Sequence, residues 1–328
     1  MNLVFFSLIV ALLFDRMLGE ARHFHPLVGL GNIAKLLELR LNSPKMSSRI
    51  RYLLGVMVLF LILIPICTCA HLLGIQSQKH PLAELFFSAF ILYLVIGGRS
   101  LSEHSMAVKY ALDSGNLGWA RTRVGYMVSR ETGGMTEEAV SIASIESVLE
   151  NGSDSIFAPI FWFVLGGLID AGPTAVIGYR IINTLDAMWG YRSDRFFAFG
   201  WAAARFDDIV NFIPARLCAV SYATAVVGKC AGSVNLSRQA VACWWQQASS
   251  HDSPNAGPVM ACGAGALNVK LGGPVRYGDK AIVKAPLGIG LSATPHDIVR
   301  SLHLVKTSVL IWVVSVGIVA VVTESFQT

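Results

Sequence analysis

The chain of 328 residues is 54% hydrophobic and only 14% charged, with a mean hydropathy of +0.56 and a formal net charge of +5. A soluble domain usually carries about 25% charged residues, so this composition indicates an integral membrane protein. The modest net charge and the lack of any run of lysine and arginine exclude a nucleic-acid partner from the expected functions. The six cysteines form no C-x-x-C pair and no zinc spacing with histidine, so we interpret them as packing residues.

Four apolar segments predict membrane-spanning helices. A hydrocarbon layer of about 30 Å requires about 20 apolar residues in a helix. Residues 52–74 and 304–323 meet this length, and 82–98 is slightly short. The first apolar segment, 2–18, lacks the basic start and the A-x-A cleavage site of a signal peptide, so we expect a membrane helix there as well.

The distribution of basic residues predicts the orientation. Short loops rich in lysine and arginine stay in the cytoplasm, whereas the loop 76–81 has one lysine and is expected to face outward. The loop between the first two spans carries Arg16, Arg22, Lys35, Arg40, Lys45, Arg49 and Arg51. We therefore predict one all-α, polytopic domain over residues 1–328 in the bacterial cytoplasmic membrane. It should have about four to five transmembrane helices, with helical hairpins and cytoplasmic motif loops.

Two further apolar segments, 156–184 and 209–229, leave their relation to the membrane open. In the first, GGLIDAGP (Gly166 to Pro173) supplies a turn, and each half has about ten residues, too few to cross. We expect a helical hairpin that dips into the membrane or packs in a core. If neither segment crosses, the polar tracts between Arg99 and the last span all lie on the cytoplasmic side.

The tract SIESVLENGSD places two acidic residues on one helix face. Glu146 and Glu150 are four residues apart, and like charges at this spacing destabilise a helix by a few tenths of a kcal/mol. A divalent ion between the two carboxylates would offset that cost, whereas a solvated helix face is the commoner explanation. Asn151-Gly152 should break the helix and leave Asp154 in a turn or cap.

The tracts NTLDAMWGYR and ARFDDIVNFIPARL concentrate polar residues between apolar flanks. The second predicts a helix up to Phe212 that Pro214 limits. The polar residues of the two tracts that are candidates for a site are Asn183, Asp186, Arg192, Arg205, Asp207, Asp208, Asn211 and Arg216. Buried carboxylates must be paired or must coordinate a metal. Acids that hold Mg²⁺ and arginines that bind phosphate form a familiar set for nucleotide chemistry.

A third tract, residues 251–279, is rich in glycine. Glycine lets the backbone approach a ligand closely, and Lys270 is placed to meet an anion. Close packing of small residues between membrane helices is the alternative. Neither G-x-x-x-x-G-K-[ST] nor G-x-G-x-x-G occurs in the chain.

Taken in chain order, these pieces resemble the adenosylcobinamide-phosphate synthase family of cobalamin biosynthesis. The resemblance covers nearly the whole chain, and NTLDAMWGY and ARFDDIVNFIPARL are its most specific parts. Its other parts are Asp15, Gly19, His25-Pro26, GGRSL at 97–101, SRET at 129–132, ESVLENGSDSIFAP at 146–159 and SPNAG with AGALNVKLGGP. The chain departs from the family at Glu131 and Met260, where Asp and Glu are usual.

The resemblance implies an ATP-dependent amide ligase of cobalamin biosynthesis. Its substrates would be adenosylcobyric acid and aminopropanol or its O-phosphate, with Mg²⁺ as cofactor. Membrane lipid and other enzymes of the pathway would be its partners. The residues implied in catalysis are Asp186, Arg205, Asp207 and Asp208. Those implied in binding substrate or phosphate are His25, Arg99, Asn183, Arg192, Asn211, Arg216, Asn255 and Lys270. The implied metal ligands are Glu150, Asp154, Asp186, Asp207 and Asp208.

Two other functions stay open. One is a non-catalytic inner-membrane sensor or regulator, related to the membrane protein implicated in β-lactamase induction. Such a protein is expected to lose part of the aspartate and arginine set, which is intact here. The other is a transporter, which would place acids within clean spans. Residues 52–74 and 304–322 contain no acid, which disfavours a transporter.

Overall fold

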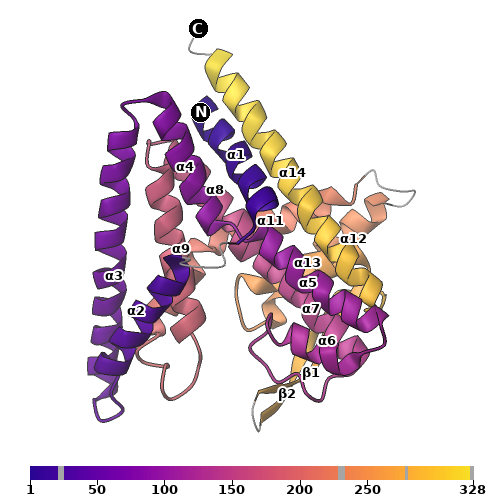
Figure 1. The fold of residues 1–328 in the computed structure, drawn as a ribbon. Helices are drawn as coiled ribbons and strands as arrows, with labels where there is room; N and C mark the ends of the chain where they lie inside the picture. Colours follow the sequence, from indigo (N-terminus) through magenta and orange to yellow (C-terminus); the bar gives the residue numbers. More distant parts are fainter. Residues whose placement is uncertain (21–25, 228–232, 278–279, 326–328) are drawn as a thin grey trace. The chain divides into compact units, whose positions relative to one another are not determined.

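The computed structural model of the chain describes residues 1–20, 26–227, 233–277 and 280–325 (Figure 1). Helices dominate the described residues, which confirms the predicted all-α class. A small three-stranded sheet is present that the sequence analysis did not predict. The chain forms two compact units. The first unit contains residues 1–97, 158–211 and 316–328, and the second contains 98–157 and 212–315. The prediction of a single domain stays a prediction.

The first unit is built around the contact between α3 and α9. Val58 and Leu59 of α3 pack with Leu185 and Trp189 of α9 in one buried cluster. The loop after α9 approaches α3 closely, since a Cβ at Gly55 would lie 2.0 Å from the carbonyl oxygen of Phe199. The helices of this unit are α1 (Asn2–Leu18), α2 (Pro26–Leu41), α3 (Ser48–Ser77), α4 (Pro81–Val95), α8 (Ala158–Gly167), α9 (Gly172–Trp189), α10 (Trp201–Val210) and the end of α14 (Pro295–Ser325).

The hairpin predicted from GGLIDAGP is confirmed as α8 and α9. Its turn is closed by the amide of Ala171, which donates to the carbonyl of Gly166 at 2.8 Å, and Asp170 takes a positive φ of 55°. α8 has 10 residues, as expected for one half, but α9 has 18, so the expected length of the second half is wrong. Polar residues on α9, including Arg180 and Asn183, interrupt its apolar character without ending the helix.

The second unit encloses α13, all 12 residues of which are buried. Two glycines allow this close packing. A Cβ at Gly263 would lie 2.7 Å from the side chain of Leu149, and one at Gly265 would lie 2.8 Å from Cα of Ala240. The elements of this unit are α5 (Gly98–Asp113), α6 (Leu117–Val124), α7 (Glu137–Gly152), a π-helical turn η1 (Ser153–Phe157), α11 (Phe212–Ala225), α12 (Ser233–Gln247), η2 (Ala248–Ser250), α13 (Ala256–Leu267), β1 (Val269–Tyr277), β2 (Lys280–Leu287), β3 (Leu291–Ser292) and the first part of α14.

The strands of the second unit have the order β2-β1-β3. β1 and β2 are antiparallel, with Leu271 opposite Leu287, and β1 and β3 are parallel. The register shifts between Leu271 and Gly273, which flank a glycine with a φ of +87°. The glycine-rich tract is therefore partly an irregular strand, rather than only loop or packed helix.

Three stretches of the described residues are long and apolar enough to cross a membrane: Ser48–Ser77, Pro81–Asp113 and Pro295–Ser325. They contain the predicted spans 52–74, 82–98 and 304–323. The second stretch is interrupted at Ile96 and Gly97, between α4 and α5. α1 forms the helix expected over 2–18 but, with 17 residues, is not among the three.

The predicted helix through ARFDDIVNFIPARL divides in two. α10 ends at Val210, Asn211 lies between the helices, and α11 begins at Phe212. The expectation that Pro214 limits the helix is wrong. Pro214 lies in the first turn of α11, where the missing amide hydrogen costs nothing because first-turn amides have no partner within the helix.

Candidate functional site

In the first unit, α9 and α10 bring two of the predicted site residues into contact. Nδ2 of Asn183 donates to Oδ1 of Asp207 at 3.3 Å, and Oδ1 of Asn183 accepts from Nη1 of Arg180 at 3.2 Å. Arg180 was not singled out from the sequence. We call Arg180, Asn183 and Asp207 the α9–α10 cluster. It combines one cationic, one neutral and one acidic side chain in partly buried positions.

Asp208 lies near two arginines, Arg205 and Arg192, rather than near an asparagine. Nη1 of Arg205 lies 3.7 Å from Oδ2 of Asp208, as their spacing of three residues predicted. The charges of Arg205 and Arg192 both act on the carboxylate of Asp208. The neighbouring aspartates therefore differ in environment, one joined to an asparagine and the other to arginines.

Asp186 lies one turn before the end of α9, and its position depends on a glycine. A Cβ at Gly190 would lie only 2.0 Å from Oδ1 of Asp186. The glycine of NTLDAMWGY is therefore required for the aspartate to fold back over the helix end. The amide of Gly190 also donates to the carbonyl of Asp186 at 2.7 Å.

Asn211, between α10 and α11, is almost fully buried, with 1% of its surface exposed. Its Oδ1 accepts from the hydroxyl of Tyr179 at 3.0 Å. Within the described part of the chain its Nδ2 has no hydrogen-bond partner. Leaving a buried donor unsatisfied costs about 1–3 kcal/mol, so this amide is a position where a ligand atom would gain an interaction.

In the second unit, α11 and the start of α13 bring Arg216 and Asn255 together. Nη1 of Arg216 donates to Oδ1 of Asn255 at 2.9 Å and to the carbonyl of Phe212 at 2.8 Å. Nη2 donates to the carbonyl of Pro254 at 3.1 Å, and the guanidinium lies over the ring of Phe212, 3.5 Å from its centre. All these partners are neutral, and burial lowers the pKa of Arg216.

Glu146 is held by a buried ion network in the second unit. Its Oε2 accepts from Nη2 of Arg130 at 2.7 Å, with Nζ of Lys284 at 3.7 Å. Its Oε1 accepts from the amide of Gly272 at 3.0 Å. The side chains of Arg130 and Glu146 are only 5% and 6% exposed. The expectation of a solvated face is therefore wrong, because sequence-distant groups cover this side of α7.

Glu150 lies one turn further along α7. Burial raises its pKa, and the nearby charge of Glu146 adds to this, although Lys284, His251 and Arg130 act against it. The chain does not break at Asn151-Gly152 as expected. Helix α7 runs into the π-helical turn that contains Asp154. Such turns are rare and often occur at functional sites.

The remaining predicted residues lie elsewhere on the two units. Arg99 pairs with Glu103 on α5, with 2.6 Å between Nε and Oε1. Lys270 is exposed on β1, and Arg192 is exposed in the loop after α9. His25 lies outside the described residues.

The predicted metal ligands divide between the units, with Asp186, Asp207 and Asp208 in the first and Glu150 and Asp154 in the second. Among the residues that the structure describes, no group of three or more His, Cys, Asp or Glu side chains is arranged to hold a metal ion. Mg²⁺ is commonly held by one or two carboxylates and completed by substrate phosphates and water. The carboxylate of Asp207, which accepts from Nδ2 of Asn183, suits that smaller requirement.

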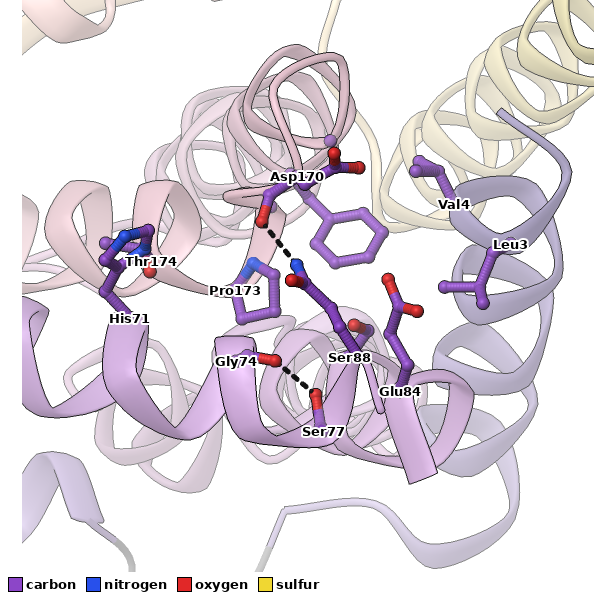
Figure 2. A pocket seen from close by; sticks show the side chains of 14 residues that line it. Leu3, Val4, His71, Gly74, Ser77, Glu84, Ser88, Asp170, Pro173 and Thr174 are labelled. Atoms are coloured by element: carbon purple, nitrogen blue, oxygen red, sulfur yellow. Dashed lines mark hydrogen bonds between the residues drawn. The ribbon is translucent and has the colours of Figure 1, made fainter. Parts of the chain in front are cut away.

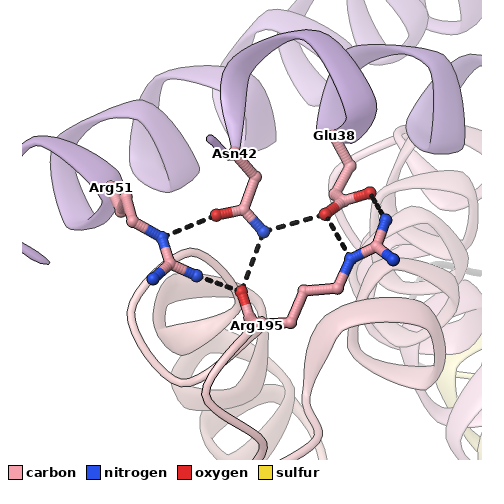
Figure 3. Close-up of polar contacts among 4 residues, drawn as sticks. All are labelled: Glu38, Asn42, Arg51 and Arg195. Atoms are coloured by element: carbon pink, nitrogen blue, oxygen red, sulfur yellow. Dashed lines mark hydrogen bonds and ion pairs between the residues drawn. The ribbon is translucent and has the colours of Figure 1, made fainter. Parts of the chain in front are cut away.

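A second ion network, in the first unit, was missed by the sequence analysis (Figure 3). Glu38 on α2 accepts two hydrogen bonds from Arg195, at 2.9 Å from Nε and 2.6 Å from Nη2, and one from Asn42 at 2.8 Å. Arg51 donates from Nε to Oδ1 of Asn42 at 2.7 Å and contacts the carbonyls of Asp194 and Arg195. No spacing rule finds this network, since Glu38 and Arg195 are 157 residues apart.

The helical architecture, the three apolar stretches and the buried polar clusters define a polytopic membrane protein. The sequence profile of the family described as CobD/Cbib protein matches residues 8–305. The chain is therefore a member of the CobD/Cbib family and has the family's role in cobalamin biosynthesis, which confirms the resemblance found in the motifs.

Similar proteins support this placement. The "Cobalamin biosynthesis protein CobD" of Chromobacterium violaceum is 45% identical over 309 residues, covering 92% of each chain. That of Stutzerimonas stutzeri is 46% identical over 309 residues, covering 94% of this chain and 95% of the relative. That of Mycobacterium tuberculosis is 34% identical over 302 residues, covering 91% and 90%. No solved structure matches the chain.

Proposed function

We propose that the protein is an ATP-dependent amide ligase that joins a propionate side chain of adenosylcobyric acid to aminopropanol or its O-phosphate. The observation that carries this proposal is the environment of Arg216. A guanidinium held by Asn255 and Pro254 stands at the beginning of α13. The beginning of a helix has a partial positive charge and attracts anions. A cation in that place, bound only to neutral acceptors among the described residues, favours an anionic ligand.

The helix itself offers few free amides to such a ligand. Oγ of Ser253 accepts from the amides of Asn255 and Ala256 at 3.3 and 3.1 Å, and the carbonyl of Ser253 accepts from Gly257 at 3.2 Å. Arg216 is therefore the group that would bind the anion. A carboxylate and a phosphate both suit its planar, two-pronged donor arrangement.

The proposed reaction requires activation of the substrate carboxylate. Transfer of the γ-phosphoryl group of ATP to a carboxylate oxygen gives an acyl phosphate and ADP. Attack by the amine then forms the amide and releases phosphate and a proton. Mg²⁺, when bound, would neutralise charge on the transferring phosphoryl group. Asp186, Asp207 and Asp208 are the residues proposed to hold it.

The test is a direct assay of the purified protein in detergent. Adenosylcobyric acid, Mg²⁺, ATP and either amino alcohol are supplied, and the corrinoid product is followed by mass spectrometry. We expect product that depends on ATP. Arg216→Met should lower its rate at least about 100-fold, because a charged donor near a developing anion contributes effects of this size.

Arg121→Met is the matched control, because Arg121 is an arginine of the same unit that donates to a backbone carbonyl, that of Met135, at 2.7 Å. It should keep most of the activity. Absence of product from the wild-type chain, with an established ligase of the family active in the same assay, would overturn the proposal and favour the regulator.

A further inference from the structure

The turn of the α8–α9 hairpin meets the C-terminal end of α3. Nε2 of Gln78 donates to the carbonyl of Asp170 at 3.0 Å. Around this contact the beginnings of α1 and α4 also converge, and together they line a cavity that includes Val4, Glu84 and Thr174 (Figure 2). The beginnings of α1 and α4, the end of α3 and the turn between α8 and α9 therefore lie at the same end of the first unit.

The other end of α9 meets the opposite end of α3. The loop after α9 binds Arg51 through the carbonyls of Asp194 and Arg195. The ring of Trp201 lies edge-on to that of Tyr52, with 5.8 Å between centres. Between the two ends, a Cβ at Gly178 would lie 3.4 Å from Sγ of Cys67. α9 therefore runs antiparallel to α3 along most of its length.

The length of α9 suits a bilayer. Its 18 residues extend about 27 Å at 1.5 Å per residue, close to the thickness of a hydrocarbon layer of about 30 Å. α3, its neighbour, is the most hydrophobic of the three apolar stretches. We propose that α9 crosses the membrane beside α3. The turn at Asp170 then emerges on the opposite face from Arg51 and the Glu38 network.

The polar side chains of α9 are consistent with this placement. Polar residues inside a membrane must find partners within the protein, and the α9–α10 cluster supplies them for Asn183. The ring of Phe206, next to Asp207, is edge-on to that of Phe60, with 5.6 Å between centres. Phe60 belongs to the middle part of α3, and Asn183 lies six residues before the end of α9 that is near Arg51, so the cluster lies in the half of the span nearer that end.

The distribution of charged residues predicts which end of α9 lies on the cytoplasmic face of the membrane and which lies on the outer face. At the Arg51 end of the first unit, α2, the loop to α3 and the start of α3 carry Lys35, Arg40, Lys45 and Arg49. At the Asp170 end, the loop between α3 and α4 carries one basic residue, Lys79, and the cavity contains the acids Glu84 and Asp170. Basic residues near spans remain cytoplasmic, which places the hairpin turn on the outer face.

Single cysteines test the crossing in a chain whose six native cysteines are replaced by alanine or serine. Ile169→Cys and Ser193→Cys mark the two ends of α9, and both positions are exposed. Lys79→Cys and Lys45→Cys mark the two ends of α3. A membrane-impermeant maleimide is applied to spheroplasts and to inverted membrane vesicles. We expect the maleimide to label Ile169→Cys from outside, as it labels Lys79→Cys. It should label Ser193→Cys from inside, as it labels Lys45→Cys.

Reaction of both α9 markers from the same side would overturn the proposal. If the cysteine-free chain does not accumulate, a protease site inserted after Ile169 or after Ser193 in the native chain gives the same information. Cleavage from outside at the first and from inside at the second supports the crossing, and cleavage of both from inside overturns it. The result is independent of whether the ligase activity is found.

Discussion

Glu38 in the first unit and Glu146 in the second are both buried, with 3% and 4% of their surfaces exposed, yet they are neutralised in different ways. The side chain of Arg195, which binds Glu38, is 55% exposed. The side chain of Arg130, which binds Glu146, is 5% exposed. One acid is bound by an arginine that reaches in from solvent, and the other by an arginine that is itself enclosed.

The difference predicts how each network responds to loss of a partner. Removing one member of a fully buried ion pair leaves a charge that water cannot reach, which destabilises a protein by about 3–5 kcal/mol. Where the partner is exposed, water replaces much of the lost interaction, and the ion pair contributes less. The Glu146 network should therefore matter mainly for stability of the second unit, and the Glu38 network more weakly for that of the first.

The largest effect is expected for Arg130→Met. This change keeps most of the side-chain volume. Of the partners that the structure describes, it leaves Glu146 with Lys284, at 3.7 Å, and the amide of Gly272. We expect a loss of about 3 kcal/mol of stability, measured as a lower midpoint of thermal unfolding in detergent.

The double variant Arg130→Met with Glu146→Gln sharpens this expectation. Because it removes the uncompensated charge, it should be more stable than Arg130→Met alone, and the double-mutant cycle measures the coupling. Equal stability of the wild type and Arg130→Met would show that Lys284 alone neutralises Glu146.

A smaller decrease is expected for Arg195→Met. Glu38 keeps its hydrogen bond from Asn42 at 2.8 Å, and water gains access from the side that Arg195 occupied. The midpoint should fall by less than half of the change caused by Arg130→Met, in the same detergent and buffer. A larger fall than that of Arg130→Met would reverse the comparison and show that solvent does not reach Glu38.

The pH dependence should also distinguish the first unit. Burial disfavours the ionised form of Glu38, but the hydrogen bonds from Arg195 and Asn42 outweigh it and hold the pKa of Glu38 below its usual value. The stabilisation is therefore complete above the unfolded pKa of about 4.3, and it is lost as the pH falls through the lower folded pKa. The wild type should exceed Glu38→Gln in unfolding midpoint at pH 7, and the gap should narrow below about pH 4. A gap that is constant or widens in acid would contradict this assignment.

The sequence predicts those features that depend on neighbours along the chain. The spans 52–74 and 304–323 follow from continuous apolar length, and the hairpin turn follows from Gly166 to Pro173. The pairing of Arg205 with Asp208 follows from helical spacing. Each of these requires only local geometry and composition.

Features that join distant segments are not predicted. The amide of Gly272 donates to Glu146, 126 positions away in the chain. Spacing within α7 does not reveal such a distant partner, and it therefore suggested a solvated helix face. The strands β1 and β2 were also missed, although β-branched residues flank a Gly-Asp pair at 278–279, a pattern typical of a hairpin. The glycines at 272 and 273 obscured the first strand because they interrupt its alternation.

The smallest effect is expected for Arg51→Lys, which tests whether the outer part of the Glu38 network depends on charge or on geometry. Arg51 joins three acceptors at once: Oδ1 of Asn42 at 2.7 Å, the carbonyl of Asp194 at 3.1 Å and the carbonyl of Arg195. Lysine keeps the charge but lacks the planar fork, so one of these hydrogen bonds should be lost. A hydrogen bond between exposed or neutral groups contributes about 1 kcal/mol, and the unfolding midpoint should fall less than in Arg195→Met.

If Arg51→Met is no less stable than Arg51→Lys, geometry alone explains the contribution of Arg51. If Arg51→Met is clearly worse, the positive charge itself stabilises the acidic centre at Glu38, and the exposed network acts through electrostatics as the buried one does.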